Sequence, residues 1–93
     1  MPIGLLEMDL YLPQCTTRKE KRVILNGLKT KMRKRFNVSV AEIDSQGLWQ
    51  RATLMIVVAS ADTQGANSLL SHVVTFVERE RGVHILDYRL SFL

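Results

Sequence analysis

Residues 51–61 read Arg-Ala-Thr-Leu-Met-Ile-Val-Val-Ala-Ser-Ala, and they form the most β-rich segment of this 93-residue chain. Apolar side chains occur at both odd and even positions, so an extended strand presents them on both of its faces. Strands with this pattern are typical of the middle of a sheet. The segment therefore predicts a central strand, and the elements before and after it must supply its neighbours.

The sequence after this strand predicts a helix and then a last strand. Asp62 is a suitable N-cap, and Gly82 is suited to end the helix because Gly adopts left-handed backbone conformations readily. Between them, apolar residues recur at helical spacing: Ala66, Leu69, Leu70, Val73 and Val77. Residues 83–93 alternate as a strand. We expect one face to carry Leu86, Tyr88, Leu90 and Phe92, and the other to carry Ile85, Asp87, Arg89 and Ser91.

The sequence before the central strand predicts a strand, a helix and a strand. Residues 3–13 alternate, with Leu6, Met8, Leu10 and Leu12 on one face and Leu5, Glu7, Asp9 and Tyr11 on the other. A helix over 18–36 follows, begun by Thr17 and Glu20, which have the spacing of a capping box. We expect its buried stripe at Ile24, Leu25, Leu28, Met32 and Phe36. Residues 38–44 alternate again, and residues 44–47 have the composition of a turn.

The predicted order of elements is β-α-β-β-α-β over a single domain, residues 1–93. Short connections and right-handed crossovers make this most simply an α+β, ferredoxin-like split βαβ fold. We therefore expect a four-stranded antiparallel sheet with both helices on one face.

Composition is typical of a small globular protein, with 46% hydrophobic and 24% charged residues. The longest apolar run is far shorter than the roughly 20 residues that cross a bilayer. The acids Glu7 and Asp9 interrupt the first apolar stretch, which is unlike a signal peptide. A single cysteine excludes an internal disulfide and fits a reducing compartment. We expect a cytoplasmic protein with no membrane partner.

The positive charge of the chain is concentrated in the first predicted helix. Residues 18–35 hold nine basic residues and one acid, a formal charge of +8, whereas the rest of the chain holds four basic and eight acidic residues, or −4. Cations near a helix N-terminus oppose the macrodipole, so their presence there favours an external anion. The candidate nucleic-acid-binding residues are Arg18, Lys19, Lys21, Arg22, Lys29 and Arg33. The alternatives are a solvated helix face, or an acidic protein or membrane surface as partner.

The open face of the predicted sheet is a second candidate surface. Its acids oppose the base stacking that RNA-binding sheets of this topology use. They are Glu7, Asp9 and Asp87, together with Glu42. They suggest a metal or catalytic cluster as the alternative to cross-strand pairing with Arg89 or Arg51. The face also carries apolar residues, Ile3, Leu5, Ile85 and Val57. We expect self-association, most simply a dimer, through this face.

The residues Trp49, Gln50 and Arg51 form a candidate partner-binding motif before the central strand. One interpretation makes Trp49 a lid over the core with its N–H hydrogen-bonded. The other makes it a stacking platform beside Arg51 for a base or a partner peptide. The sequence leaves both interpretations open.

Sequence patterns for catalysis are lacking. Cys15 precedes the first helix, whose terminus and cations would lower the pKa of the thiol, but neither His72 nor His84 is placed to act as its base. Two histidines and one cysteine make no zinc pattern, and there is no phosphate-binding or dinucleotide-binding motif. We expect no enzymatic activity, no cofactor and no metal.

Two stretches, Arg35-Phe-Asn-Val-Ser-Val-Ala-Glu-Ile-Asp44 and Leu48-Trp-Gln-Arg-Ala52, resemble the pattern of the YlxP-like family. The resemblance extends over the whole chain through Ile3-Gly-Leu-Leu-Glu7, Lys19-Glu-Lys-Arg22 and Leu86-Asp-Tyr88. Members are small bacterial cytosolic proteins of unknown function, and the resemblance implies a ferredoxin-like fold. Members are often encoded beside translation factors and a ribosome-binding factor, which implies a role around the ribosome. It implies no catalytic residues.

These observations predict a small non-enzymatic, RNA- or ribosome-associated protein whose helix at 18–36 contacts phosphates. The alternative is a homo-oligomeric protein-interaction module with no nucleic-acid binding. The two differ in how strongly partner binding depends on salt, because contacts with phosphates release counterions.

Overall fold

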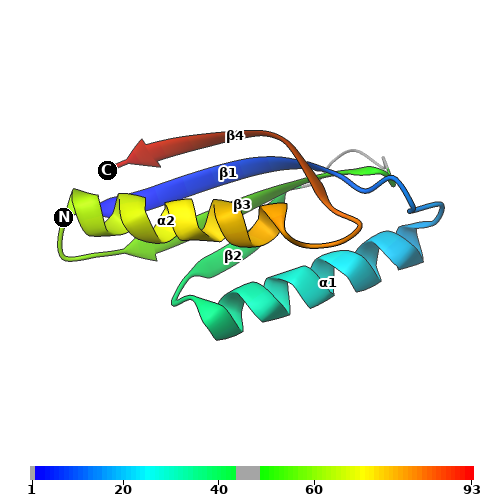
Figure 1. Cartoon of the computed structure of the whole chain (residues 1–93), viewed down its shortest axis with the longest axis horizontal. Helices are drawn as coiled ribbons and strands as arrows, with labels where there is room; N and C mark the ends of the chain where they lie inside the picture. Colours follow the sequence, from blue (N-terminus) through cyan, green and yellow to red (C-terminus); the bar gives the residue numbers. More distant parts are fainter. Residues whose placement is uncertain (1, 44–48) are drawn as a thin grey trace.

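The computed structural model describes residues 2–43 and 49–93, and it has six elements in the predicted order β-α-β-β-α-β (Figure 1). The elements are β1 (Ile3–Tyr11), α1 (Arg18–Arg35), β2 (Ser39–Ile43), β3 (Arg51–Ala59), α2 (Thr63–Glu78) and β4 (His84–Phe92). Each begins and ends within a few residues of its predicted bounds. The turn predicted at 44–47 lies outside the described residues.

The four strands form one antiparallel sheet in the order β2-β3-β1-β4. Both helices lie on the same side of this sheet (Figure 1), which confirms the ferredoxin-like prediction. The strand predicted to be central, β3, lies between β2 and β1. Its second face is nevertheless open, because both helices cover the other face, and Val57 remains 37% exposed there.

The core lies between the sheet and the helices. On β1, Leu6, Met8 and Leu10 alternate towards the helices and are fully buried, as their spacing predicted. The helix stripes are confirmed in large part, with Leu25, Leu28 and Met32 buried on α1, and Ala66, Leu70, Val73, Val74 and Val77 buried on α2. Neither described helix is long and apolar enough to cross a membrane.

A β-bulge in β4 makes one part of the strand prediction wrong. The register of β4 against β1 shifts between Asp9 and Leu10, so that Asp9 pairs with Asp87 whereas Leu10 pairs with Ile85. The extra residue, Leu86, has no partner and is 48% exposed. Ile85 therefore packs against the core instead of the open face, where the strict alternation had placed it.

Gly4 allows α2 to lie close to β1. A Cβ atom at this position would come within 2.8 Å of Leu70 Cδ1 and 3.2 Å of Ala66 Cβ, both on α2. These two side chains are fully buried, so neither has free space into which it could move. A side chain here would therefore force these packed neighbours to shift.

We expect Gly4→Ala to lower the free energy of unfolding by about 1–3 kcal/mol, because the added methyl overpacks the contact between β1 and α2. Gly27→Ala is the matched control. A Cβ atom there meets nothing within 4 Å, and α1 should gain about 0.5–1 kcal/mol from the lost glycine flexibility. Chemical denaturation of both variants measures the two effects. Equal effects of the same sign would contradict the close approach at Gly4.

Candidate nucleic-acid interface

The start of α1 is held by the predicted capping box. The Thr17 hydroxyl accepts a hydrogen bond from the Glu20 backbone N–H at 3.1 Å. The Glu20 carboxylate in turn accepts hydrogen bonds from the hydroxyls of Thr16, at 2.7 Å, and Thr17, at 3.2 Å. These bonds lower the pKa of Glu20, with the Thr16 hydroxyl contributing most. One anion, the chain's own carboxylate, therefore already occupies this helix end.

The rotation of α1 on the sheet divides its cations between two flanks. On one flank, Arg33 donates a hydrogen bond to the Val40 carbonyl of β2 at 3.0 Å. On the other flank, Lys31 forms a 2.9 Å salt bridge with Glu80, just after α2, and Arg35 lies over the Phe76 ring at 5.6 Å. These three side chains therefore have structural partners within the fold.

Lys21 departs from its predicted role. It lies on the same helix face as Leu25, Leu28 and Met32, and only 8% of its surface is exposed. Its aliphatic stem is suited to such a position, because long cationic side chains cover apolar surface with their methylene groups. Lys21 therefore does not belong to the exposed set of candidate phosphate contacts.

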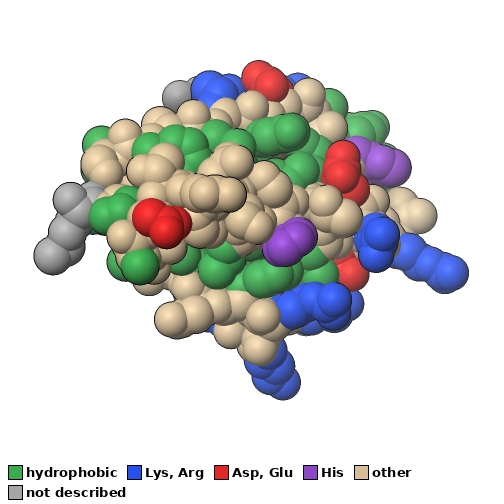
Figure 2. Space-filling view, turned by 60° about the vertical axis from the view of Figure 1, so that its left-hand side comes forward, with side chains coloured by type: hydrophobic (Ala, Val, Ile, Leu, Met, Phe, Trp, Pro, Cys, Tyr) green, Lys and Arg blue, Asp and Glu red, His purple; other side chains and the backbone are tan. Residues whose placement is uncertain are grey.

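Four predicted phosphate contacts remain: Arg18, Lys19, Arg22 and Lys29. Lys29 is half-buried and the other three are exposed. Within residues 2–43 and 49–93, none of the four forms a salt bridge. Figure 2 looks towards the end of the molecule where α1 finishes, and Lys and Arg side chains project from its lower edge. This row of three exposed cations and the half-buried Lys29 is the part of the predicted interface that has no salt bridge with the described residues.

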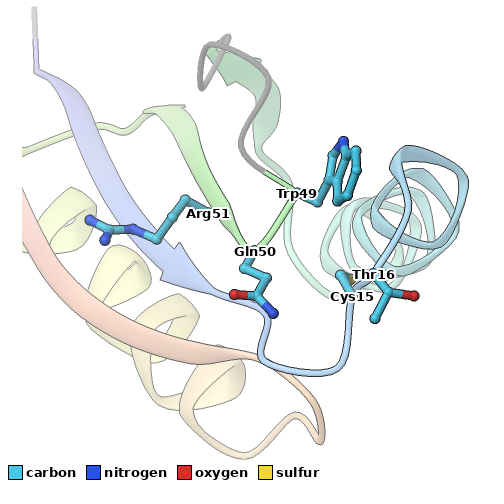
Figure 3. Close-up of a pocket in the computed structure, with 5 residues that line it drawn as sticks. All are labelled: Cys15, Thr16, Trp49, Gln50 and Arg51. Carbon is cyan, nitrogen blue, oxygen red and sulfur yellow. The ribbon is translucent and has the colours of Figure 1, made fainter.

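The motif of Trp49, Gln50 and Arg51 is split by the fold (Figure 3). The Trp49 side chain points towards the start of α1, whereas Arg51 points the opposite way. Gln50 lies between them and donates a hydrogen bond to the Pro13 carbonyl at 3.3 Å. Trp49 is 50% exposed, and its indole N–H makes no recorded hydrogen bond within the described residues. Trp49 is therefore neither a core lid nor stacked beside Arg51.

Trp49 instead borders a hollow at the end of the molecule where α1 and β3 begin. The hollow measures about 440 Å³ and its walls are mainly apolar. The described residues that line it are Cys15, Thr16, Trp49, Gln50 and Arg51 (Figure 3). Cys15 and Trp49 are far apart in the chain, and no sequence pattern joins them. The hollow was therefore missed by sequence reasoning.

The thiol of Cys15 is unsuited to nucleophilic catalysis. Only 1% of the residue is exposed, and this burial raises the pKa of the thiol, with a further contribution from nearby Glu20. Lys21 opposes the effect without reversing it. The sequence-based reason to expect a lowered pKa, proximity to a helix terminus and its cations, is thus outweighed by burial.

Three of the four acids predicted for the open sheet face surround one guanidinium, whereas Glu42 pairs with the buried Leu54 and therefore lies on the side of the sheet that the helices cover. Arg89 bonds Glu7 and lies 3.3 Å from Asp87 and 3.6 Å from Asp9. The hydrogen bond with Glu7 raises the pKa of Arg89 further above its ordinary value. Among the described residues, no group of His, Cys, Asp and Glu is arranged to hold a metal ion. A cation would have to displace Arg89, so the pairing alternative fits this cluster.

A four-stranded antiparallel sheet with two helices on one face defines a ferredoxin-like protein, and solved structures share it. The de novo designed protein LFR1 1, with a ferredoxin fold, aligns at a TM-score of 0.58 and 12% identity over 100% of this chain and 84% of its own. The de novo designed protein Ferredog-Diesel aligns at 0.50 and 12% identity over 96% and 83%. At these identities the likeness concerns the fold alone.

The family follows from the sequence comparisons. Residues 3–90 match the family described as a protein of unknown function, DUF503. The uncharacterized protein YlxP of Bacillus subtilis (strain 168) is 32% identical over 76 residues, which are 82% of this chain and 83% of that protein. The chain belongs to the DUF503 family, and its resemblance to YlxP-like proteins is confirmed. The family has no assigned function, so function must be argued from the surface itself.

The lowered pKa of Glu20 predicts that the stability of the fold depends on pH. A carboxyl with a lower pKa in the folded state stabilises the fold above its unfolded value of about 4.3, and this contribution is lost as pH falls through the folded pKa. We therefore expect Glu20→Gln to be less stable than the wild type at pH 7. The difference should disappear in strongly acidic solution. Denaturant titrations over a pH series measure it.

Glu42→Gln is the matched control, because Glu42 is exposed and makes no recorded hydrogen bond or salt bridge within the described part of the chain. Its stability should follow the wild type at every pH. A Glu20→Gln deficit that persists unchanged below the folded pKa would show that the ionised carboxylate is not the source of the stabilisation.

Proposed function

We propose that this protein is a small, non-enzymatic, cytoplasmic RNA- or ribosome-associated protein whose helix α1 contacts phosphates. The observation that supports the proposal is the row formed by the exposed Arg18, Lys19 and Arg22 and the half-buried Lys29, which forms no salt bridge with the described residues. Exposed cations without internal partners keep their full attraction for a polyanion. They can also exchange condensed counterions for contacts with a phosphate backbone.

The helix flank facing β2 suits such a contact better than the sheet does. Arg22 and Lys29 recur on the same side of α1 as Arg33, and the bond from Arg33 to Val40 shows that this side faces β2. The open sheet face instead carries three carboxylates around a single guanidinium, a net negative group that repels RNA. The RNA that we propose as partner therefore lies against α1, which contacts its phosphate backbone.

We expect Arg18→Glu combined with Arg22→Glu to weaken binding to ribosomal subunits and to generic structured RNA similarly for all sequences. For the wild type, log K should fall linearly as log salt rises. The double variant should lose about one unit of this slope for each phosphate contact that it removes. Filter binding or fluorescence anisotropy across a salt series measures both quantities.

Arg79→Glu combined with Arg81→Glu is the matched control, because it also lowers the formal net charge from +4 to 0 but changes the connection between α2 and β4. This control should keep most of the affinity and slope. Equal losses of affinity in the two double variants would show that binding depends on net charge and not on the position of the cations. Binding of the wild type that does not respond to salt would exclude a phosphate-binding helix.

The competing function is a homo-oligomeric protein-interaction module that uses the open sheet face. It is favoured by apolar side chains around the Arg89 cluster, since Ile43 and Val57 are each 37% exposed there and Leu5 and Met55 are half-buried. Mixed faces of this kind occur at interfaces between identical subunits. A dimer formed in this way would leave α1 accessible.

If this face associates, the molecular mass measured by sedimentation should rise with protein concentration. Val57→Lys should then give a monomer at all concentrations, because it places an unpaired charge in an apolar contact. Tyr88→Ala, on β4, is a control that should leave the association unchanged. A wild type that stays monomeric at high concentration would exclude the dimer.

A further inference from the structure

The hollow beside Trp49 lies next to the start of α1, the helix that carries the exposed cations. Thr16 lines it, and α1 begins two residues later at Arg18. Arg22 lies one turn further along, about 6 Å along the helix axis. The half-exposed Trp49 side chain points towards the start of α1 (Figure 3). An aromatic face, an apolar hollow and an exposed row of cations thus meet at one end of the molecule.

We propose that this hollow binds an unpaired nucleobase of the RNA strand whose phosphates lie on the first turns of α1. The inference rests on the proposed function, because the α1 cations identify the ligand as a polyanion. It adds that the ligand is single-stranded where it meets Trp49, and that Trp49 stacks on one of its bases. The cations and the ring would then bind successive parts of one strand.

The shape and chemistry of the hollow favour a base as the occupant. Its volume of about 440 Å³ is ample for a planar heterocycle, and its mainly apolar walls offer few polar groups for reading base edges. Stacking tolerates any base, because every base has a π-face. We therefore expect little sequence preference. A paired base is shielded within its helix, so a duplex cannot present one to Trp49.

The fold itself does not depend on the exposed Trp49 side chain. A tryptophan exposed by half and without a recorded hydrogen bond to the described residues contributes little to the core. The start of β3 is held without it, since the Leu12 N–H donates to the Gln50 carbonyl at 2.8 Å and the Gln50 side chain bonds Pro13. Replacing Trp49 should therefore leave the fold intact.

The test uses the intrinsic fluorescence of Trp49, the only tryptophan in the chain. The full-length protein is titrated at one low salt concentration with three probes. They are a single-stranded oligouridylate, an abasic oligonucleotide of the same length and charge, and an RNA duplex. We expect the oligouridylate to quench the fluorescence, and the abasic strand to bind about 5- to 150-fold more weakly without quenching.

Variants distinguish the contribution of the Trp49 ring from that of the α1 cations. Trp49→Ala should bind oligouridylate more weakly by the same factor and should bind the abasic strand as tightly as the wild type does. Trp49→Phe should keep most of the affinity for oligouridylate. Tyr88→Ala removes an exposed aromatic on β4 and should change neither. The comparison between oligouridylate and the abasic strand needs only the wild-type protein, so it does not depend on how the variants fold.

The outcomes distinguish this inference from the proposed function. Equal, salt-dependent binding of oligouridylate and the abasic strand, without quenching, would overturn the base-binding hollow and leave the phosphate-binding helix in place. Quenching by the duplex as strong as by the single strand would also overturn it. If no probe binds even at low salt, the proposed function fails and the inference fails with it. Quenching by a partner peptide in that case would assign the hollow to protein recognition.

Discussion

Burial of one face of α1 against the sheet is the constraint on which the candidate interface depends. Leu25, Leu28 and Met32 must all leave water, and together they allow a single rotation of the helix. That rotation determines which cations are exposed and which lie on a flank or under the helix. The charge of the segment is a property of its composition, whereas the direction of that charge is a consequence of apolar packing.

The basic segment consequently holds two groups of cations. Lys31 and Arg35 join α1 to the neighbourhood of α2, and Arg33 joins it to β2, so that these cations help to hold a helix that lies towards the β2 side of the sheet. Exposed ion pairs contribute little stability individually, about 0–1 kcal/mol. Arg18, Lys19, Arg22 and Lys29 have no such partner among the described residues, and they concentrate towards the N-terminal half of the helix. The cations that hold the fold and the cations that we propose to bind a partner thus lie on one helix.

The charged groups in the middle of the open sheet face are also paired within the fold. Arg89 lies among Glu7, Asp9 and Asp87, and Thr53 donates a hydrogen bond to Asp9 at 2.9 Å, so that polar groups in the middle of an uncovered sheet are paired with one another. Pairing across strands makes such a surface compatible with water or with a second copy of the chain. The negative groups of the sheet thus lie on the face opposite the basic helix, and the polyanion that we propose as partner would approach from the helix side.

The sequence by itself determined the order of elements, the central place of β3, the inward faces of β1 and the helices, and the N-caps of both helices. These depend on local periodicity and on groups three or four residues apart, which the chain displays directly. The sequence placed the end of α2 at Gly82, whereas α2 ends at Glu78 with Arg79 as its C-cap. Tertiary structure alone decided that Lys21 is buried, that the bulge at Leu86 turns Ile85 inward, and that burial raises the pKa of Cys15. It also decided that Trp49 and Arg51 face apart and that Trp49 meets Cys15 across a hollow. Each of these depends on contacts between residues distant in the chain, and a single sequence does not display such contacts.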